Sequence, residues 1–334
     1  MRHKTSQSDN IENNFITKEV AIIASTFSIL VIIVGIIGNI LTIIALVKGS
    51  PNLQSHATTK FIVNLAVSDL MFSALNLPLT TVRYMTRSWP FGSFLCHWFP
   101  FFFYGNVATS LMSIACITIN RFVFIAYNAR YSRIYTKLNV CLMICFCWCF
   151  SFGLMMFPLL GIWGRFGLKV TTFSCTILAD TGGHSPKKFL FVFGFVFPIT
   201  VITICYTIIW IHVRRQSRNT LKTTKRDLRL TKLIFIIFGA FVMCFAPNTI
   251  ANVLISESEY PYIHVLSSML CWLNSCINPF IYFAMNAKYR RALKRVLAFG
   301  THSSGAMINE SIVSQSDQIK SSVIYCFQCL ASND

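Results

Sequence analysis

Asp69 is the only acidic side chain within any long apolar stretch of this 334-residue chain. A carboxylate placed in hydrocarbon is costly, so Asp69 must face other protein groups and have polar partners. Side chains that carry an oxygen atom occur in three other apolar stretches: Asn39, Asn106, Ser110, Asn274, Ser275 and Asn278. Oxygen atoms of this kind hold a small cation or ordered water, which predicts a structural sodium ion at Asp69 and Ser110. The alternative is that these groups only join helices.

The remaining reactive side chains do not form a catalytic set. The apolar stretches contain no histidine–glutamate metal set, no serine–histidine pair and no paired carboxylates, which argues against an enzyme. Four cysteines crowd one stretch: Cys141, Cys145, Cys147 and Cys149. On a helix, Cys145 and Cys149 share a face but Cys147 does not, and no histidine accompanies them, so we interpret them as buried apolar thiols. For Cys326 and Cys329, metal binding and palmitoylation both stay open.

Seven apolar stretches must position these side chains. A helix that rises about 1.5 Å per residue crosses a hydrocarbon core of about 30 Å in about 20 residues, and each stretch is long enough. The stretches are Val20–Val47, Ala57–Val82, Gly92–Tyr127, Leu138–Leu160, Phe189–Val213, Leu230–Ile255 and Tyr262–Met285. After the seventh, basic and apolar residues interleave in the pattern of an amphipathic helix that lies on the membrane surface.

The composition agrees with a membrane protein. Hydrophobic residues make up 54% of the chain and charged residues 12%, and the mean hydropathy is +0.60, whereas soluble domains carry about 25% charged residues. We therefore predict an all-α membrane protein: a seven-transmembrane helix bundle over 20–285 and a short amphipathic eighth helix over 286–298. We expect residues 1–19 to form an extracellular N-terminus and residues 299–334 a disordered cytoplasmic tail.

The basic residues predict the orientation in the membrane. The net charge is +18, but the Lys and Arg residues lie between apolar stretches, so they indicate topology and contact with anionic membrane lipids rather than nucleic-acid binding. With the N-terminus outside, 20 of the 29 Lys and Arg residues fall on the cytoplasmic side and nine on the outer side. This count predicts a multi-pass plasma-membrane protein with an extracellular N-terminus and a cytoplasmic C-terminus.

Short motifs occur in each of the seven stretches in a fixed order. They are Gly38-Asn39, Leu65-Ala66-Val67-Ser68-Asp69, Asn120-Arg121-Phe122, Trp148, Pro198 with Tyr206, Cys244-Phe245-Ala246-Pro247 and Asn278-Pro279-Phe280-Ile281-Tyr282. In these motifs the chain resembles the rhodopsin-like (class A) G-protein-coupled receptors, over residues 20–298. The resemblance implies a receptor whose partner is a heterotrimeric G protein, with arrestin and a receptor kinase as further partners.

The resemblance assigns an activation switch to the cytoplasmic half of the bundle. Arg121 would restrain the sixth stretch through Asp227 in the inactive state and meet the G protein in the active state. Three positions depart from the family: Asn120 replaces the usual Asp, Phe122 the usual Tyr, and Phe245 the usual Trp of the toggle position. Because asparagine cannot form an ion pair with Arg121, we expect more basal activity or a greater reliance on Asp227.

Two tyrosines and two prolines complete this switch. By resemblance, Tyr206 and Tyr282 would swing toward Arg121 on activation. Pro247 and Pro279 each remove a backbone hydrogen bond from a helix, which permits the kinks that such motions use.

Of the 13 cysteines, only Cys96 and Cys175 fall on the predicted outer side. The oxidising compartment permits a disulfide there, and the family resemblance implies one between these two residues. The bond would hold the loop before the fifth stretch over the outer end of the bundle.

The resemblance also places a ligand pocket in the outer half. Phe103 stands where amine receptors carry Asp, and Trp272 stands where opsins carry the Schiff-base lysine, so neither ligand class is expected. The predicted pocket residues are Phe102, Phe103, Tyr104, Phe245, Asn248, Asn252 and Trp272. Their mostly aromatic character favours a lipid-like ligand, with packing of the helix core as the alternative. Six basic residues near the mouth favour an anionic amphipath, such as a lysolipid or a fatty acid: Arg83, Arg87, Arg165, Lys169, Lys187 and Lys188.

Three loop motifs resemble one arthropod branch of the family, the Trapped in endoderm and Moody receptors. The motifs are Gly161–Gly167 (GIWGRFG), Thr172–Leu178 (TFSCTIL) and Arg130–Tyr135 (RYSRIY). This resemblance implies a role in directed cell migration, including that of germ cells, or in epithelial or glial barriers. The alternative is a seven-helix channel or transporter, which would need a continuous polar path, whereas the polar residues here cluster at mid-bundle under aromatic side chains.

Overall fold

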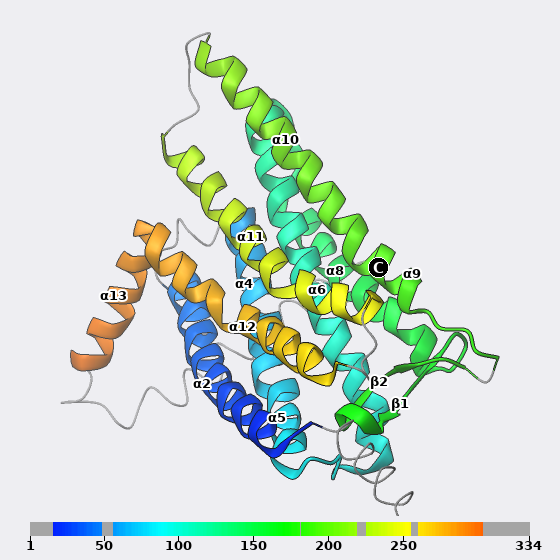
Figure 1. The fold of residues 1–334 in the computed structure, drawn as a ribbon. Helices are drawn as coiled ribbons and strands as arrows, with labels where there is room; N and C mark the ends of the chain where they lie inside the picture. Colours follow the sequence, from blue (N-terminus) through cyan, green and yellow to red (C-terminus); the bar gives the residue numbers. More distant parts are fainter. Residues whose placement is uncertain (1–15, 49–55, 181, 219–224, 255–259, 303–334) are drawn as a thin grey trace, which may run out of the picture.

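The computed structural model describes residues 16–48, 56–180, 182–218, 225–254 and 260–302. Within them, the chain forms a bundle of long helices with a small β-hairpin at one end (Figure 1). The predicted fold class, a seven-helix bundle followed by an eighth helix, is confirmed. The predicted N-terminal segment and tail fall largely outside the described residues, as do Cys326 and Cys329.

Seven segments make up the bundle. They are α2 (Lys18–Lys48), α4 with η1 and α5 (Ala57–Met71, Phe72–Asn76, Leu77–Thr86), α6 (Gly92–Ala126), α8 (Lys137–Leu159), α9 with η3 and α10 (Lys187–Phe191, Val192–Val196, Phe197–Arg218), α11 (Lys225–Leu254) and α12 (Pro261–Met285). Among the described residues, six of these segments are long and apolar enough to cross a membrane. The seventh, α12, has the length, but polar side chains such as His264, Asn274 and Asn278 lower its hydropathy.

Helix α6 occupies the middle of the bundle. It packs against α4, α8, α10 and α11 and against both strands of the hairpin. Asn64 of α4 donates from Nδ2 to Ser113 Oγ on α6 (2.7 Å) and accepts at Oδ1 from Trp148 Nε1 on α8 (2.8 Å). Polar groups inside a membrane protein must find partners within the protein. These hydrogen bonds therefore join three helices, and both polar atoms of the Asn64 side chain have partners.

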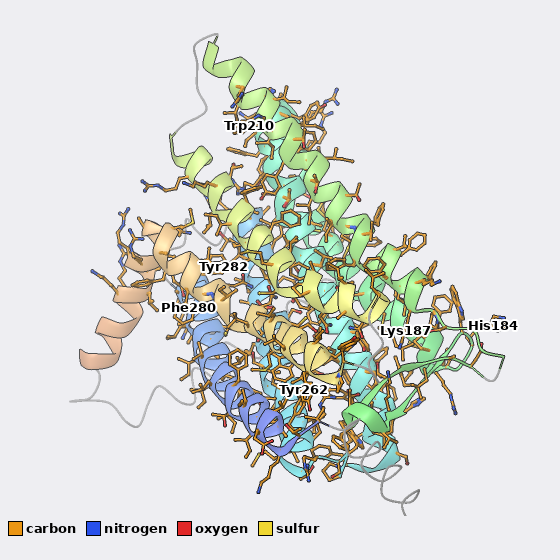
Figure 2. All side chains as sticks on the ribbon, viewed as in Figure 1. His184, Lys187, Trp210, Tyr262, Phe280 and Tyr282 are labelled. Atoms are coloured by element: carbon orange, nitrogen blue, oxygen red, sulfur yellow. A yellow bond between two sulfur atoms is a disulfide. The ribbon has the colours of Figure 1, made fainter. Side chains whose placement is uncertain are left out.

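Apolar side chains cover the outside of the bundle as well as its interior. Trp210 is 58% exposed and Phe280 59% exposed, and Tyr262 is also exposed (Figure 2). Soluble monomers rarely expose so many large apolar side chains. The outer surface is therefore suited to contact with lipid chains.

Two short π-helical segments, Phe72–Asn76 and Val192–Val196, interrupt the second and fifth bundle segments. Each ends two residues before a proline, Pro78 or Pro198. The residue that precedes the proline donates its N–H to the carbonyl five residues earlier. Proline has no N–H, and its ring clashes with the carbonyl four residues before it, so the turn that precedes it widens. The sequence analysis did not anticipate these segments.

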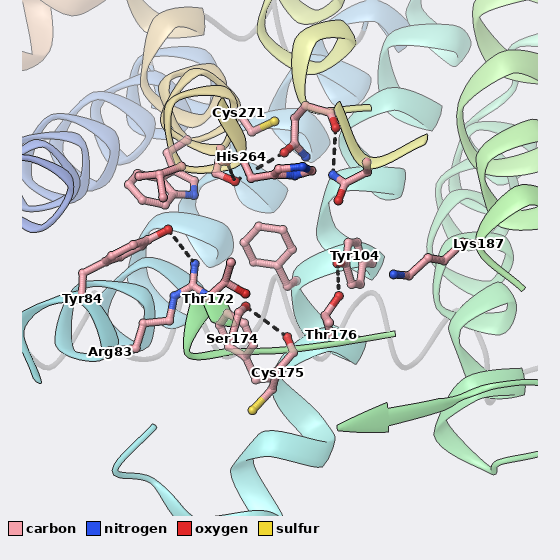
Figure 3. Close-up of a pocket in the computed structure, with 17 residues that line it drawn as sticks. Arg83, Tyr84, Tyr104, Thr172, Ser174, Cys175, Thr176, Lys187, His264 and Cys271 are labelled. Atoms are coloured by element: carbon pink, nitrogen blue, oxygen red, sulfur yellow. Dashed lines mark hydrogen bonds between the residues drawn. The ribbon is translucent and has the colours of Figure 1, made fainter. Parts of the chain in front are cut away.

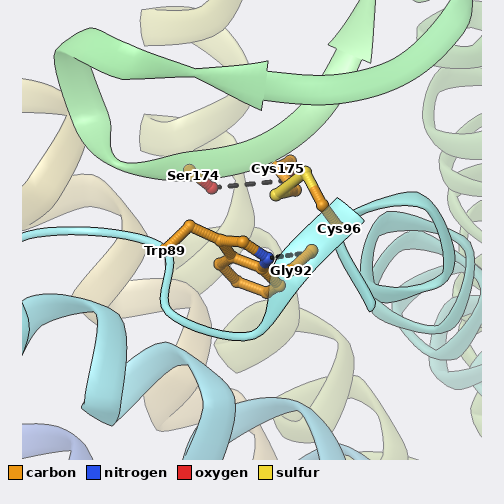
Figure 4. The surroundings of a disulfide bond; sticks show 5 residues. All are labelled: Trp89, Gly92, Cys96, Ser174 and Cys175. Atoms are coloured by element: carbon orange, nitrogen blue, oxygen red, sulfur yellow. Dashed lines mark hydrogen bonds between the residues drawn. A yellow bond between two sulfur atoms is a disulfide. The ribbon is translucent and has the colours of Figure 1, made fainter. Parts of the chain in front are cut away.

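A β-hairpin covers one end of the bundle, the end that is predicted to face the outside. Strands β1 (Arg165–Lys169) and β2 (Ser174–Leu178) pair antiparallel across the short turn η2 (Val170–Thr172). Cys175 of β2 forms a disulfide with Cys96 in the first turns of α6, with a Cα–Cα distance of 5.2 Å (Figure 4). The predicted disulfide is confirmed, whereas the strands themselves were missed.

The eighth helix, α13 (Ala287–His302), turns sharply away from α12 (Figure 1). The Tyr289 hydroxyl lies 3.0 Å from Thr42 Oγ1 of α2. Arg290 Nη1 donates to the carbonyls of Phe283 and Ala284, both at 2.9 Å, near the end of α12. These contacts fix the angle between the two helices because they satisfy carbonyls that a helix end leaves without partners.

Candidate functional site

Asp69 is buried at the centre of the bundle, with 1% of its surface exposed. Ser110 Oγ of α6 donates to one carboxylate oxygen (3.0 Å), and Asn278 Nδ2 of α12 donates to the other (2.7 Å). The side chains of three helices therefore meet at this carboxylate. Both of its oxygens accept a hydrogen bond, which offsets part of the cost of burying the group.

Other members of the predicted polar set form a second group. Asn39 Nδ2 donates to the carbonyls of Ser275 (2.7 Å) and Gly35 (2.8 Å), and Ser73 Oγ donates to Ser275 Oγ (3.2 Å). These contacts join α2 and η1 to α12, one turn away from Asn278. The expectation of a single ring of six side chains around Asp69 therefore needs correction, because Asn39 and Ser275 bond at a different height on α12.

Asn106 and Asn274 bear on the predicted sodium ion. They lie four residues before Ser110 and Asn278, so each pair shares a helix face. In the described part of the chain, the buried amide oxygens of Asn106, Asn274 and Asn278 have no hydrogen-bond partner. Each such oxygen costs about 1–3 kcal/mol, a cost that a cation or a water molecule would remove. These residues fit a sodium ion held by Asp69 and Ser110, and that ion stays a prediction.

Asn120 and Arg121 face different partners near the C-terminal end of α6. The Arg121 guanidinium lies over the ring of Phe124, 5.5 Å from its centroid. Asn120 is fully buried; its Oδ1 accepts from Thr58 Oγ1 (2.7 Å) and its Nδ2 donates to the Tyr131 hydroxyl (3.1 Å). Asn120 thus joins α6 to α4 and to the short helix α7 (Asn128–Ile134). Asn120, at the position where the family usually has a carboxylate, thus links three helices by hydrogen bonds.

The two switch tyrosines pack against other aromatic rings. The ring centroid of Tyr206 lies 5.2 Å from that of Phe235 of α11, and the ring centroid of Tyr282 lies 6.0 Å from that of Tyr289 of α13. The Tyr282 hydroxyl is buried and has no hydrogen-bond partner among the described residues. A buried hydroxyl of this kind gains free energy if it moves to a partner, which is compatible with the swing predicted for Tyr282.

The remaining switch residues lie on the helices where the sequence placed them. Phe122 packs on the ring of Tyr127 at 5.6 Å, and Pro247 and Pro279 lie inside α11 and α12. Asp227 belongs to the first turn of α11, but its side chain is outside the described part, so its pairing with Arg121 stays a prediction.

A cavity of about 80 Å³ lies at the end of the bundle that the hairpin covers, between β2 and the helices α5, α6, α11 and α12 (Figure 3). We call it the outer cavity, because this end is predicted to face the outside. Five of the seven predicted pocket residues line it: Phe103, Tyr104, Asn248, Asn252 and Trp272. Helix α6 and the hairpin also meet here through a hydrogen bond of 2.8 Å between the Tyr104 hydroxyl and Thr176 Oγ1.

Two predicted pocket residues do not line the cavity. Phe102 is 38% exposed and packs against Trp98 and Phe152 on the outside of α6. Successive residues of a helix point about 100° apart, so Phe102 turns outward where Phe103 turns inward. Phe245 is buried and stacks on Phe241, with 4.4 Å between the two ring centroids.

The cavity is more polar than the sequence analysis expected. The polar side chains that line it, besides the two asparagines, are Arg83, Thr172, Ser174, Thr176, Lys187, His264 and Ser268. The sequence analysis placed Arg83 and Lys187 only at the mouth and missed the other five. Loops and helix ends lack the periodicity that would show which way a side chain faces. The sequence did contain one signal for Arg83. An arginine at the end of an apolar stretch is costly unless it has a partner or a function.

Residues 38–282 match the family model described as "7 transmembrane receptor (rhodopsin family)". The chain belongs to this family. Protein trapped in endoderm-1 of Drosophila melanogaster is 41% identical over 294 residues, which cover 79% of this chain and 74% of that protein. The G-protein coupled receptor moody of the same species is 33% identical to this chain. The alignment covers 82% of this chain and 51% of moody. The crystal structure of squid rhodopsin superposes with a TM-score of 0.76 at 25% identity, covering 91% of this chain and 92% of that one.

Family membership establishes the general role of the receptor. It is a multi-pass membrane protein of a family of receptors rather than enzymes, and this family couples to heterotrimeric G proteins. The two insect relatives confirm the branch that the loop motifs predicted.

Proposed function

We propose that this receptor converts the binding of an extracellular, lipid-like ligand into nucleotide exchange on a heterotrimeric G protein. One observation carries the proposal: α6 lines the outer cavity with Phe103 and Tyr104 and holds the buried Arg121 near its other end. The 18 residues from Phe103 to Arg121 span about 27 Å of helix, close to the thickness of a membrane core. A ligand that shifts or rotates α6 would therefore act at both membrane faces.

Three kinds of residue would transmit the signal. Pro247 and Pro279 supply flexible points in α11 and α12. The Tyr282 hydroxyl has no hydrogen-bond partner within the described part of the chain, and a second conformation would satisfy it. Arg121 would meet the G protein. We place the N-terminus outside, as the basic residues predict, and we expect arrestin and a receptor kinase to act on the cytoplasmic side.

The test is nucleotide exchange on a panel of purified G proteins by the receptor in lipid nanodiscs. The wild type should accelerate exchange on at least one G protein, and Arg121→Ala should abolish this acceleration. The Asp227→Asn variant should raise basal exchange if that carboxylate restrains Arg121. Unchanged basal exchange in this variant would show that the predicted pair does not form, and no exchange by the wild type on any G protein would refute the coupling.

At the level of the organism, we propose a role in directed cell migration, including that of germ cells, or in barrier organisation. The support is the similarity to trapped in endoderm-1 and moody. Deleting the receptor in the animal that carries it should misplace germ cells or open an epithelial or glial barrier. Normal germ-cell positions and an intact barrier would contradict the assignment.

A channel or transporter is the second candidate. The aromatic side chains of Tyr84, Phe103 and Trp272 line the outer cavity. They offer no continuous polar path, so proteoliposomes that contain the receptor should show no ion flux above that of empty vesicles.

A further inference from the structure

Arg83 is a buried cation at the wall of the outer cavity. It lies in the last turn of α5, and only 6% of its surface is exposed. Its Nη2 donates to the Tyr84 hydroxyl at 3.3 Å, and its guanidinium lies over the Tyr84 ring at 4.6 Å. Its Nε and Nη1 have no hydrogen-bond partner in the described chain. Two of the three donor nitrogens of this charged, planar group are therefore buried and unused.

No acidic side chain in the described part of the chain balances this charge. Asp69 accepts from Ser110 and Asn278 in the middle of the bundle. Asp180 accepts from backbone N–H groups of its own loop, and Glu19 lies exposed at the start of α2. A buried charge without a partner is strongly unfavourable, so its presence in a cavity wall indicates that a ligand supplies the counter-charge.

Further donors line the same cavity. Thr172 Oγ1 and Trp272 Nε1 are buried, and neither has a hydrogen-bond partner among the described residues. Figure 3 shows Arg83 and Thr172 on one side of the cavity and Lys187 on the other. Guanidinium and indole groups can only donate, so the group that satisfies them must be rich in acceptors.

The size of the cavity limits which part of a ligand it holds. Its volume of about 80 Å³ is well below the 300–1,000 Å³ or so of pockets that enclose a whole drug-sized ligand. A head group fits this space, whereas an acyl chain does not. The polar lining agrees, because an acyl chain there would leave the donors unpaired.

We infer that the cavity binds the phosphate monoester head of a single-chain lipid and that Arg83 is its bidentate anchor. The inference rests on the proposed lipid-like ligand and specifies its chemical class. Arg83 matches two oxygens of a phosphate in one plane, while Thr172, Trp272 and Lys187 approach from other directions. A phosphate has three terminal oxygens to share among these donors, and a carboxylate has only two.

The test measures ligand-induced thermal stabilisation of purified full-length receptor in nanodiscs, without G protein. The probes are 1-oleoyl lysophosphatidate, oleate, monoolein and glycerol 3-phosphate. Lysophosphatidate should stabilise the receptor and bind more tightly than oleate, and neutral monoolein should not compete with it. Glycerol 3-phosphate distinguishes the source of the phosphate: weak competition indicates a lipid, and binding as tight as that of lysophosphatidate indicates a soluble phosphate and overturns the lipid part of the inference. Equal binding of monoolein overturns the anionic head group itself.

Variants then localise the site. Arg83→Gln should weaken lysophosphatidate binding by about 10- to 100-fold, the loss expected for charge-assisted hydrogen bonds. Arg83→Lys keeps the charge but loses the fork, so it should restore only part of the affinity. Arg133→Gln is the matched control, since Arg133 is an exposed arginine in the last turn of α7, outside the cavity. If Arg83→Gln does not fold, Thr172→Val removes one donor and should weaken binding several-fold.

Unchanged binding in Arg83→Gln, or an equal loss in Arg133→Gln, would overturn the role of Arg83. The design also separates this inference from the proposed coupling, because binding is measured without G protein. Lysophosphatidate binding by a receptor that activates no G protein would refute the coupling and retain the site. Exchange activity with no phosphate-dependent binding would refute the site and retain the coupling.

Discussion

Asn120 shows how one residue changes the role of its position. An aspartate there could pair with the neighbouring Arg121, but the asparagine uses its amide to join Thr58 of α4 and Tyr131 of α7. Both polar atoms of the side chain have partners, so the residue is well placed as a structural link. The restraint on Arg121 must then come from elsewhere, and Asp227 is the predicted source.

Replacing Asn120 with Asp should lower basal G-protein activation. The carboxylate has the same shape, can still accept from Thr58 and Tyr131, and adds a charge next to Arg121, worth about 1 kcal/mol or more when partly buried. Basal nucleotide exchange should fall several-fold. Asn128→Asp, at an exposed position of α7, adds the same charge away from Arg121 and should leave exchange unchanged; a rise in exchange with Asn120→Asp would contradict the restraint.

Sodium should stabilise the receptor through Asp69. Ligands that bind only the folded state raise the free energy of unfolding in proportion to ln(1 + [L]/Kd), so the Tm should rise when NaCl replaces choline chloride at constant ionic strength. Asp69→Asn should remove this rise, because the amide carries no charge to balance the cation. Equal sodium effects on the wild type and the variant would place the ion elsewhere.

At the scale of elements, close approach of helices decides the arrangement of the polar side chains. Gly35 of α2 lies against Ser73 of η1, and a Cβ atom at this position would overlap Ser73 Oγ. That same hydroxyl donates to Ser275 of α12. The absent side chain of Gly35 therefore permits α2, η1 and α12 to share one network of hydrogen bonds.

Gly35→Ala should destabilise the receptor by about 1–3 kcal/mol, the usual cost of overpacking. Gly153→Ala in α8 is the matched control, because nothing lies within 4 Å of a Cβ atom there and alanine favours a helix by about 0.5–1 kcal/mol over glycine. Thermal unfolding in nanodiscs should show a lower Tm for the first variant and an unchanged or higher Tm for the second. The opposite order would mean that α2 does not pack as described.

At the scale of the whole molecule, the outer cavity exists because the hairpin is held over the bundle. The Cys96–Cys175 bond closes a loop of 79 residues and holds Ser174, Cys175 and Thr176 at the cavity wall. Without it, only weaker contacts such as that between Tyr104 and Thr176 would hold the hairpin in place.

The double variant Cys96→Ser/Cys175→Ser should lower the stability of the receptor by roughly 2–4 kcal/mol and weaken lysophosphatidate binding, because the wall of the cavity loses its position. Thermal unfolding and probe binding measure the two effects. Cys149→Ser changes a free thiol on α8 that is exposed, not buried as the sequence analysis expected, and should alter neither. Full binding by the double variant would show that the hairpin does not form the cavity.

The sequence alone determined the seven helices, the eighth helix, the family and the presence of Asp69 among polar side chains. These follow from hydrophobic length, from motif order and from the small number of charges in the apolar stretches, all of which are local properties of the chain. The pairing of Cys96 with Cys175 was implied by the resemblance to the family. Only the tertiary structure showed that Ser110 and Asn278, and not Asn39, bond to Asp69, and that Phe102 faces outward. Only the structure brought Arg83, Thr172 and Trp272 to one cavity, since helix rotation and loop placement depend on packing between segments far apart in sequence, which no local pattern records.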